Sequence, residues 1–379
     1  MTVRFLHSSD WQIGKVFRFV DEKAMGLLQE ARLAAITRLG ELAIAHNARH
    51  VLVAGDVYDM EALAPRSLNQ PLERMRNFGA VCWHLLPGNH DPHRPGGLWD
   101  QLLRKGLPSN VRVHVVPEPV TADDGAMIVL PAPLQHRRTL TDPTAYMDGL
   151  ALPEGLPRIG LAHGSVTGFG SSQDKANYIA PDRPFRAGLA YLALGDWHSQ
   201  KKISDRCWYS GTPETDAFDV TEGGKALHVE IEGPHTLPKV TPLETGSYTW
   251  ISLCENMNCR ADIDALQEKI RSLGPHPDRT LAHLEVKGAL SLEDRAYFED
   301  HIGDRLSAAF CFLRIDDKWL VPQPTAADLD QIDSRGFVRR AAEELRRRAA
   351  EGGEGEREIA AEALHRLYVE HKKLQADQQ

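Results

Sequence analysis

Long apolar runs, paired cysteines and an excess of positive charge are all missing from this chain of 379 residues. No stretch approaches the roughly 20 apolar residues of a membrane-spanning helix, and the start turns polar too early for a secretory signal, so we expect a cytoplasmic protein without membrane contact. The five cysteines are odd in number and scattered, which predicts reduced, mostly buried thiols rather than disulfides or a zinc site. The net charge of −9 should repel nucleic acid, so DNA binding would need bound cations or local basic patches.

The order of apolar segments predicts how the chain is divided. Strands alternate with helical segments over residues 3–230, which is typical of an α/β fold. Residues 232–242 are rich in proline and glycine and predict a linker. We therefore predict a large domain over residues 1–235, a small α/β domain over 245–320 and a charged helical arm over 325–379.

Five short motifs stand at the ends of predicted strands and carry carboxylate, amide or imidazole side chains. They are Asp10-Trp-Gln12, Gly55-Asp56-Val-Tyr-Asp59, Gly88-Asn-His-Asp91, His163-Gly164 and Gly195-Asp-Trp-His198. Each motif alone is weak, because a Gly-Asp after a strand is most often an ordinary turn and a single histidine is more often an ordinary polar residue than a ligand. Together they predict one site, because loops at the carboxyl ends of strands converge on one crevice. Hard divalent ions bind such side chains. Two neighbouring ions need a carboxylate that bridges them, and Asp56 is the candidate for this role.

These motifs carry a family resemblance. In the contexts Ser8-Ser-Asp-Trp-Gln-Ile-Gly14 and Tyr191-Leu-Ala-Leu-Gly-Asp-Trp-His198 the chain resembles the calcineurin-like metallophosphoesterase superfamily, and within it the SbcD-type DNA repair nucleases. The segment Trp208-Tyr-Ser-Gly-Thr-Pro-Glu214 resembles one that follows the last motif in those nucleases. The resemblance implies a sandwich of two mixed β-sheets flanked by helices, a small α/β cap and a C-terminal helical arm.

The resemblance also implies which residues hold two metal ions. The first ion would be held by Asp10, Gln12, Asp56 and His198, and the second by Asp56, Asn89, His163 and Asp196. Two positions depart from the family pattern, since Gln12 and Asp196 stand where histidines are usual. Both supply oxygen instead of nitrogen, which favours Mn²⁺, or else Mg²⁺, over zinc.

Two residues of the third motif are candidates for catalysis. The resemblance places His90 beside the scissile phosphate, where it would stabilise developing charge or protonate the leaving oxygen. Asp91 would either orient His90 or cap the turn, and the sequence does not decide between these roles. Trp11 and Trp197, in the middle of two motifs, are expected to pack beneath the loops rather than stack on bases.

The resulting hypothesis is a metal-dependent DNA nuclease of the SbcD type, acting as exonuclease or endonuclease. One alternative is a phosphodiesterase or phosphatase for small molecules, although a small substrate would need neither cap nor arm. The other is a non-catalytic subunit that binds DNA ends and has a degraded metal site. Metal content separates this second alternative from an enzyme, which should hold about two ions per chain.

The C-terminal arm carries the predicted protein partner. In SbcD-like proteins this region is implied to dock on a coiled-coil ATPase of the SbcC type. The stripe that contains Leu364 and Leu367 is either that docking face or packs within the chain. Pairing of two chains is left open.

Overall fold

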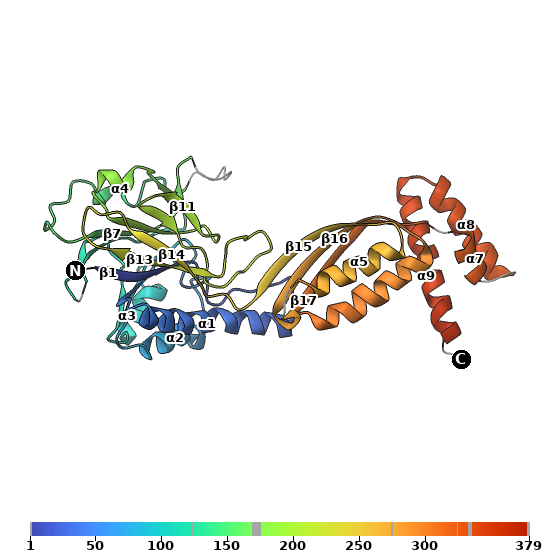
Figure 1. The fold of residues 1–379 in the computed structure, drawn as a ribbon, viewed down its shortest axis with the longest axis horizontal. Coiled ribbons are helices and arrows are strands. Elements are labelled where there is room, and N and C mark those ends of the chain that lie inside the picture. Colours follow the sequence, from blue (N-terminus) through green and yellow to red (C-terminus); the bar gives the residue numbers. More distant parts are fainter. Residues whose placement is uncertain are drawn as a thin grey trace. The chain divides into compact units, whose positions relative to one another are not determined.

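The computed structural model describes residues 2–122, 124–168, 176–273, 276–323, 325–332 and 336–376. It divides into two compact units, Met1–Tyr248 and Thr249–Gln379 (Figure 1). The predicted three-part division stays a prediction, and part of the predicted arm, residues 333–335 and 377–379, lies outside the described residues. Each unit is described separately.

Unit 1 contains two six-stranded mixed sheets, which confirms the predicted α/β sandwich. The first sheet has the order β14 (Lys239–Glu244), β13 (Lys225–Ile231), β1 (Val3–Ser8), β2 (His50–Val53), β3 (Cys82–Leu85), β4 (Val111–Val113). The second has the order β11 (Lys201–Ser204), β12 (Cys207–Tyr209), β10 (Tyr191–Gly195), β7 (Arg158–His163), β6 (Ile128–Ala132), β5 (Val120–Thr121). A short pair, β8 (Ser165–Val166) and β9 (Tyr178–Ile179), lies beyond β7 in sequence.

Strand alternation sorts the apolar side chains of unit 1 into layers. Phe5 and Leu52 of the first sheet join Val129 and Leu161 of the second in one buried cluster between the sheets. The opposite face of the first sheet is covered by α1 (Glu22–Ala45), α2 (Pro65–Arg76) and α3 (Leu98–Lys105) (Figure 1). The short helices Ala145–Met147 and α4 (Arg183–Arg186) belong with the second sheet, where Met147 packs in its outer cluster.

Parallel pairing is the feature that positions the site. β1, β2, β3 and β4 run parallel, as do β6, β7, β10 and β12. The carboxyl ends of each parallel set therefore meet at one edge of their sheet, and the five predicted motifs follow these ends.

Unit 2 has a three-stranded parallel sheet of β15 (Thr249–Met257), β16 (Thr280–Leu290) and β17 (Phe312–Pro322). Its core is formed with α5 (Arg260–Arg271) and with α6 (Leu292–Phe298), which continues as a π-helical segment over Glu299–Leu306. Single turns of 3₁₀-helix occupy Pro277–Arg279 and Ser307–Ala309. Trp319 and Val321 of β17 remain exposed.

Three helices complete unit 2: α7 (Ala326–Ile332), α8 (Phe337–Glu351) and α9 (Glu354–Ala376). Leu364 is fully buried in a cluster with Leu292, Leu329 and other side chains of unit 2, and Leu367 packs against that cluster. The stripe of Leu364 and Leu367, for which docking on a partner was one of two predicted roles, therefore packs within the chain. Ile359 of the same helix, in contrast, is 73% exposed.

The predicted absence of membrane-spanning helices and of disulfides can be compared with the structure. Among the described residues, no helix has both the length and the apolarity required to cross a membrane. No disulfide forms among the five cysteines, all of which lie in the described part of the chain. The prediction that they are mostly buried is wrong, since Cys254 and Cys259 are exposed. Cys254 lies on β15, an edge strand of the sheet of unit 2, and Cys259 comes just after this strand.

Candidate metal centre

The predicted motif residues lie at the edge where the parallel strands of unit 1 end. Asp10, Asp56 and Asn89 follow β1, β2 and β3, while His163 ends β7 and Asp196 follows β10. Backbone hydrogen bonds connect these loops, since the N–H of Asp10 donates to the Gly55 carbonyl at 3.1 Å and that of Gln12 to the Asp56 carbonyl at 2.9 Å. The loops therefore support one another.

The centre of this edge is formed by Asp10, Asp56 and His163. Their ligand-type atoms all lie within 4.8 Å of one another, and the residues are 0%, 2% and 0% exposed. Burial raises the pKa of Asp10, and the nearby Asp56 carboxylate raises it further, against the lowering effect of His198 and His163. Two buried carboxylates this close repel each other, so the donor set fits a bound divalent cation that offsets the repulsion.

His163 is held with one nitrogen facing the carboxylates. Its Nδ1 lies 2.8 Å from the Ala54 carbonyl oxygen, which can only accept, so Nδ1 carries the proton and donates. Its Nε2 lies 3.1 Å from Asn89 Oδ1 and 3.5 Å from Asp56 Oδ1. Burial lowers the pKa of His163, but the surrounding carboxylates outweigh it and raise the value to about 9. Because Nδ1 donates to Ala54, Nε2 is the nitrogen that would release its proton and bind a metal.

Asp196 is attached to the same centre from the second sheet. Its backbone N–H lies 3.2 Å from both carboxylate oxygens of Asp10. The Ser165 hydroxyl donates to Asp196 Oδ2 at 2.7 Å, and Asn89 Nδ2 lies 3.5 Å from Oδ1. The predicted second-ion set of Asp56, Asn89, His163 and Asp196 is therefore brought together.

Gln12 and His198 lie on the other side of Asp10. The Gln12 Nε2 and His198 Nε2 atoms are 3.3 Å apart, and His198 Nε2 is 3.9 Å from Asp10 Oδ1. Asp10, Gln12 and His198 of the predicted first-ion set therefore lie together, but the Gln12 amide turns its nitrogen toward His198 while its oxygen accepts from Lys15. The His198 Nδ1 donates to Asp216 at 3.0 Å, which leaves its Nε2 for a ligand, as in carboxylate–histidine–metal arrangements.

The backbone at this edge is strained. Asp10, Gln12, Asp56 and Asp196 have φ values of 55°, 43°, 54° and 104°, in the left-handed region that side chains other than glycine rarely adopt. Such strain persists where the surrounding structure enforces it, often at functional sites. Gly88 is also required, because a Cβ there would lie 2.1 Å from Asp56 Oδ1.

His90 and Asp91 have different surroundings. His90 Nδ1 donates to the Asp59 carbonyl at 2.9 Å, and hydrogen bonding with Asp59 is the main cause that raises the pKa of His90 to about 9. Asp91 is fully buried and accepts from the backbone N–H groups of Gly88 at 2.7 Å and Tyr58 at 3.0 Å. These contacts correspond to the turn-capping alternative for Asp91, and the residue beside the His90 ring is Asp59.

Sequence reasoning missed the residues that support the ligands. Asp216 holds His198 and also accepts from Lys15 Nζ at 2.6 Å, while Lys15 donates to Gln12 Oε1 at 2.9 Å. Arg32 of α1, only 3% exposed, donates to the carbonyls of Asp10 at 2.9 Å and Trp11 at 2.7 Å. The position of Asp216 two residues after the Trp208–Glu214 segment was the one available signal.

The two motif tryptophans differ. Trp11 is 1% exposed and donates its indole N–H to Ser8 Oγ at 2.9 Å, as expected for packing beneath the loop. The same expectation is wrong for Trp197, which is 44% exposed beside Asp196.

Comparisons with known proteins identify the family of this chain. The SbcD subunit of the nuclease SbcCD from Rhodobacter capsulatus is 27% identical over 265 residues, and the match covers 56% of this chain and 62% of that protein. This chain thus spans less than two thirds of the relative. Among solved structures, that of TT1561 of Thermus thermophilus is similar with a TM-score of 0.37 and 13% identity, covering 65% of this chain and 100% of that one. The model of the family described as Calcineurin-like phosphoesterase matches residues 3–218, and this chain belongs to that family.

Proposed function

We propose that this phosphoesterase is a divalent-metal-dependent nuclease that hydrolyses phosphodiester bonds of DNA. The observation that carries the proposal is the buried group of Asp10, Asp56 and His163, whose ligand atoms lie within 4.8 Å of one another at the carboxyl edge of both sheets. Such a set supports the binding of two ions that share Asp56.

The donor chemistry supports Mn²⁺, with Mg²⁺ as the next candidate. The seven proposed ligands comprise five oxygen donors, Asp10, Gln12, Asp56, Asn89 and Asp196, and two imidazoles, His163 and His198. Hard ions with oxygen preference suit this set better than zinc. When bound, two such ions activate water and neutralise the phosphate. The latter is necessary in a chain with a net charge of −9.

His90 is the proposed catalytic residue. Its Nδ1 is used by the Asp59 carbonyl, so its Nε2 is the nitrogen left for the substrate, and the side chain is 43% exposed. A protonated imidazole there would donate to the leaving oxygen of the phosphodiester. Asp91 supports this residue indirectly, since it fixes the turn from Gly88 to His90 through the Gly88 N–H.

DNA and an ATPase partner are proposed from the SbcD resemblance. The curated relative is a subunit of a nuclease complex, and the chain covers 62% of its length. We assign the partner contact to the surfaces of α8 and α9 that remain outside the internal cluster of Leu364, such as the surface around Ile359. The predicted cytoplasmic location and any pairing of two chains stay predictions.

One assay tests the proposal. Purified protein with Mn²⁺ is given end-labelled single-stranded DNA, double-stranded DNA and a bis-aryl phosphate in parallel, and the Asp56→Asn variant is the matched control. Cleavage of DNA that Asp56→Asn abolishes, with about two Mn²⁺ per wild-type chain, supports the nuclease. Hydrolysis of the aryl ester alone would support a small-molecule phosphodiesterase. A protein that neither holds Mn²⁺ nor cleaves any substrate would refute catalysis.

A further inference from the structure

A second group of ligand-type side chains lies at the opposite ends of β2 and β3. His50 is the first residue of β2, and Cys82 and His84 are the first and third residues of β3. His50 pairs with Cys82 in the parallel register, and residues two apart on a strand share a face. The three side chains therefore project from the same face of the sheet, the one that carries Leu52 toward the second sheet.

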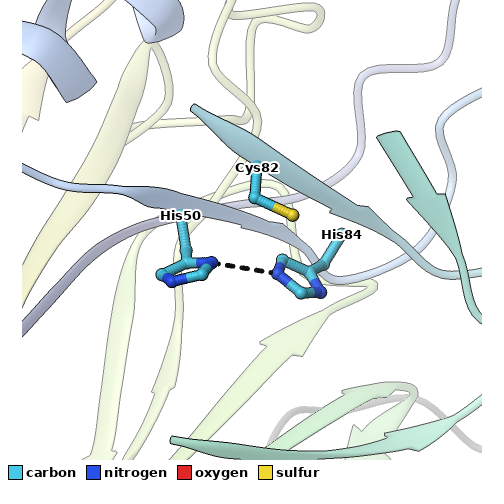
Figure 2. A group of neighbouring side chains, drawn as sticks. All are labelled: His50, Cys82 and His84. Carbon is cyan, nitrogen blue, oxygen red and sulfur yellow. Dashed lines mark hydrogen bonds between the residues drawn. The ribbon is translucent and has the colours of Figure 1, made fainter. Parts of the chain in front are cut away.

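The distances within this group match a metal site. His50 Nδ1 and His84 Nε2 are 3.2 Å apart, and the ligand atoms of His50, Cys82 and His84 all lie within 4.8 Å of one another. In a tetrahedral zinc site with Zn–N bonds of about 2.0–2.1 Å, two imidazole nitrogens lie about 3.3 Å apart. Figure 2 shows the two rings side by side, with the Cys82 side chain on the same side of the strands.

The remaining nitrogens of both histidines already have partners. His50 Nε2 lies 3.1 Å from the Asp124 carboxylate, and His84 Nδ1 lies 3.0 Å from His114 Nε2. Metal-binding histidines commonly use their second nitrogen in this way, which fixes the ring and the tautomer. The group thus has the outer hydrogen bonds of a metal site as well as the inner donors.

The protons of the group can be counted. The ionised Asp124 only accepts, so His50 Nε2 carries a proton and Nδ1 has a lone pair directed at His84. Without a metal, His84 Nε2–H donates to that lone pair and His114 donates to His84 Nδ1. With a metal, the protons on the His84 and His114 rings each move to the other ring nitrogen, and the Cys82 thiol loses its proton. Burial lowers the pKa of both His84 and His114, so these two imidazoles suit the neutral state that a metal requires.

The site is accessible and its charges balance. A cavity of about 260 Å³ is lined by His50, Cys82, Asp124 and neighbouring residues, so an ion can enter and a water can complete four ligands. A thiolate and the Asp124 carboxylate would neutralise a divalent cation. Two positive charges lie near the group. Arg49 is 3.7 Å from Asp124, and the charge of Arg112 lowers the pKa of His84 and His114.

We propose that His50, Cys82 and His84 form a second metal site, distinct from the phosphoesterase centre, that takes a borderline-soft divalent cation of the Zn²⁺ class. His50 begins β2 and Asp56 follows its end, so the strand alone separates them by on the order of 13 Å. Nitrogen and sulfur donors select zinc over the manganese favoured by oxygen donors. Through Asp124 the bound ion would tie the β5–β6 turn to β2.

Cobalt titration tests this site without reference to activity. The metal-free 379-residue chain, kept reduced and anaerobic, is titrated with Co²⁺ and followed by absorbance, because a thiolate on cobalt gives a near-ultraviolet charge-transfer band. The proposed phosphoesterase ligands include no cysteine, so the band reports only a thiolate site. We expect the band to correspond to one thiolate-bound Co²⁺ per chain, to reach its maximum by about three Co²⁺ per chain when the phosphoesterase centre also fills, and to be removed by excess Zn²⁺.

Three variants decide the outcome. Cys82→Ser should abolish the band, the control Cys254→Ser on β15 should keep it, and Asp56→Asn should keep it while losing activity. Circular dichroism of each metal-free variant establishes that it is folded. As a second approach, His50→Asn should weaken Co²⁺ binding at least tenfold with the thiol still present. Absence of the band in the wild-type protein, or its survival in folded Cys82→Ser, would overturn the proposal.

Discussion

The two ends of β2 and β3 carry opposite chemistry on the same strands. Beyond their carboxyl ends lie Asp56 and Asn89, which offer oxygen atoms, whereas their amino ends begin with His50 and Cys82, which offer nitrogen and sulfur. Parallel pairing aligns both sets, because each register position brings one residue of β2 beside one of β3. A single pair of strands can therefore bring two different donor sets together, and the residue types alone distinguish them.

Buried histidines of the two groups have pKa values that shift in opposite directions. In the phosphoesterase centre, carboxylates outweigh burial and raise the pKa of His163 to about 9. Beside the His50–Cys82–His84 group, burial and the charge of Arg112 together lower the pKa of His114, the residue after β4, to about 4. Burial acts on both residues alike, so the neighbouring charges decide the sign.

The largest effect is expected from His90→Ala at the carboxyl end. Loss of this proton donor should reduce turnover on the order of 10²–10⁴-fold. The variant should still hold two Mn²⁺ per chain in metal analysis, because His90 is not among the proposed ligands. His93→Ala is the control and should remain active, because the His93 ring contacts Gln135 and Asp100 rather than the proposed ligands. Cleavage by His90→Ala at the parental rate would contradict the assignment.

Acid should destabilise the protein through His114. His114 binds a proton more weakly in the folded protein than in the unfolded chain, so its contribution to stability is present above pH 6.5 and is lost as the pH falls toward 4. The expected loss is about 3 kcal/mol in the free energy of unfolding.

Urea unfolding of the metal-free protein at a series of pH values checks this effect. His114→Asn should flatten the acid part of the curve. His163→Asn should instead flatten the alkaline part, because the contribution of a histidine with a raised pKa is present below pH 6.5 and is lost as the pH rises through about 9. Identical acid slopes for wild type and His114→Asn would rule out this role.

Gly88→Ala should damage the carboxyl end selectively. The added Cβ would lie 2.1 Å from Asp56 Oδ1, so either the turn or the bridging carboxylate must move. A displacement of about 1 Å can reduce a rate about 100-fold, and this is the loss we expect in DNA cleavage. Gly79→Ala, at the other end of β3 with open space around its Cβ position, is the matched control. Equal activity of the two variants would show that the turn is more compliant than its contacts indicate.

The smallest effect is expected from Asp216→Asn. The amide keeps a hydrogen-bond acceptor for His198 but loses the charge that also pairs with Lys15 at 2.6 Å. Mn²⁺ should bind at least about tenfold more weakly, as measured by calorimetry. Asp205→Asn, an exposed carboxylate paired with Lys202, should bind Mn²⁺ like the wild type. An unchanged affinity in Asp216→Asn would show that His198 needs no carboxylate partner.

The sequence predicted the carboxyl-end group because its signals are local. A polar motif directly after an apolar strand places Asp10 or Asp56 at a known edge without any knowledge of neighbouring strands. Asp216 gave no such signal, since it reaches His198 through the fold of a loop rather than through a strand end. The exposure of Trp197 gave no signal either, because Trp11 stands at the same place in an equivalent motif and is buried.

The amino-end group could not be predicted because it depends on pairing. His50 and His84 stand 34 residues apart, and only the register between β2 and β3 brings them together. Alone, each resembles an ordinary strand histidine. The stripe of Leu364 was undecided for the same reason: helical spacing identifies an apolar face, but only the tertiary structure shows that Leu292 and Leu329 cover it.

The left-handed backbone at Asp10, Gln12, Asp56 and Asp196 couples the path of the loops to the position of the ligands. Each such torsion costs of order 1–3 kcal/mol, so contacts within the protein must hold it. The hydrogen bonds from the Asp10 N–H to Gly55 and from the Gln12 N–H to Asp56 are two such contacts. A substitution that loosens these loops would therefore let the backbone relax and spread the ligand side chains apart, even at a distance from the site.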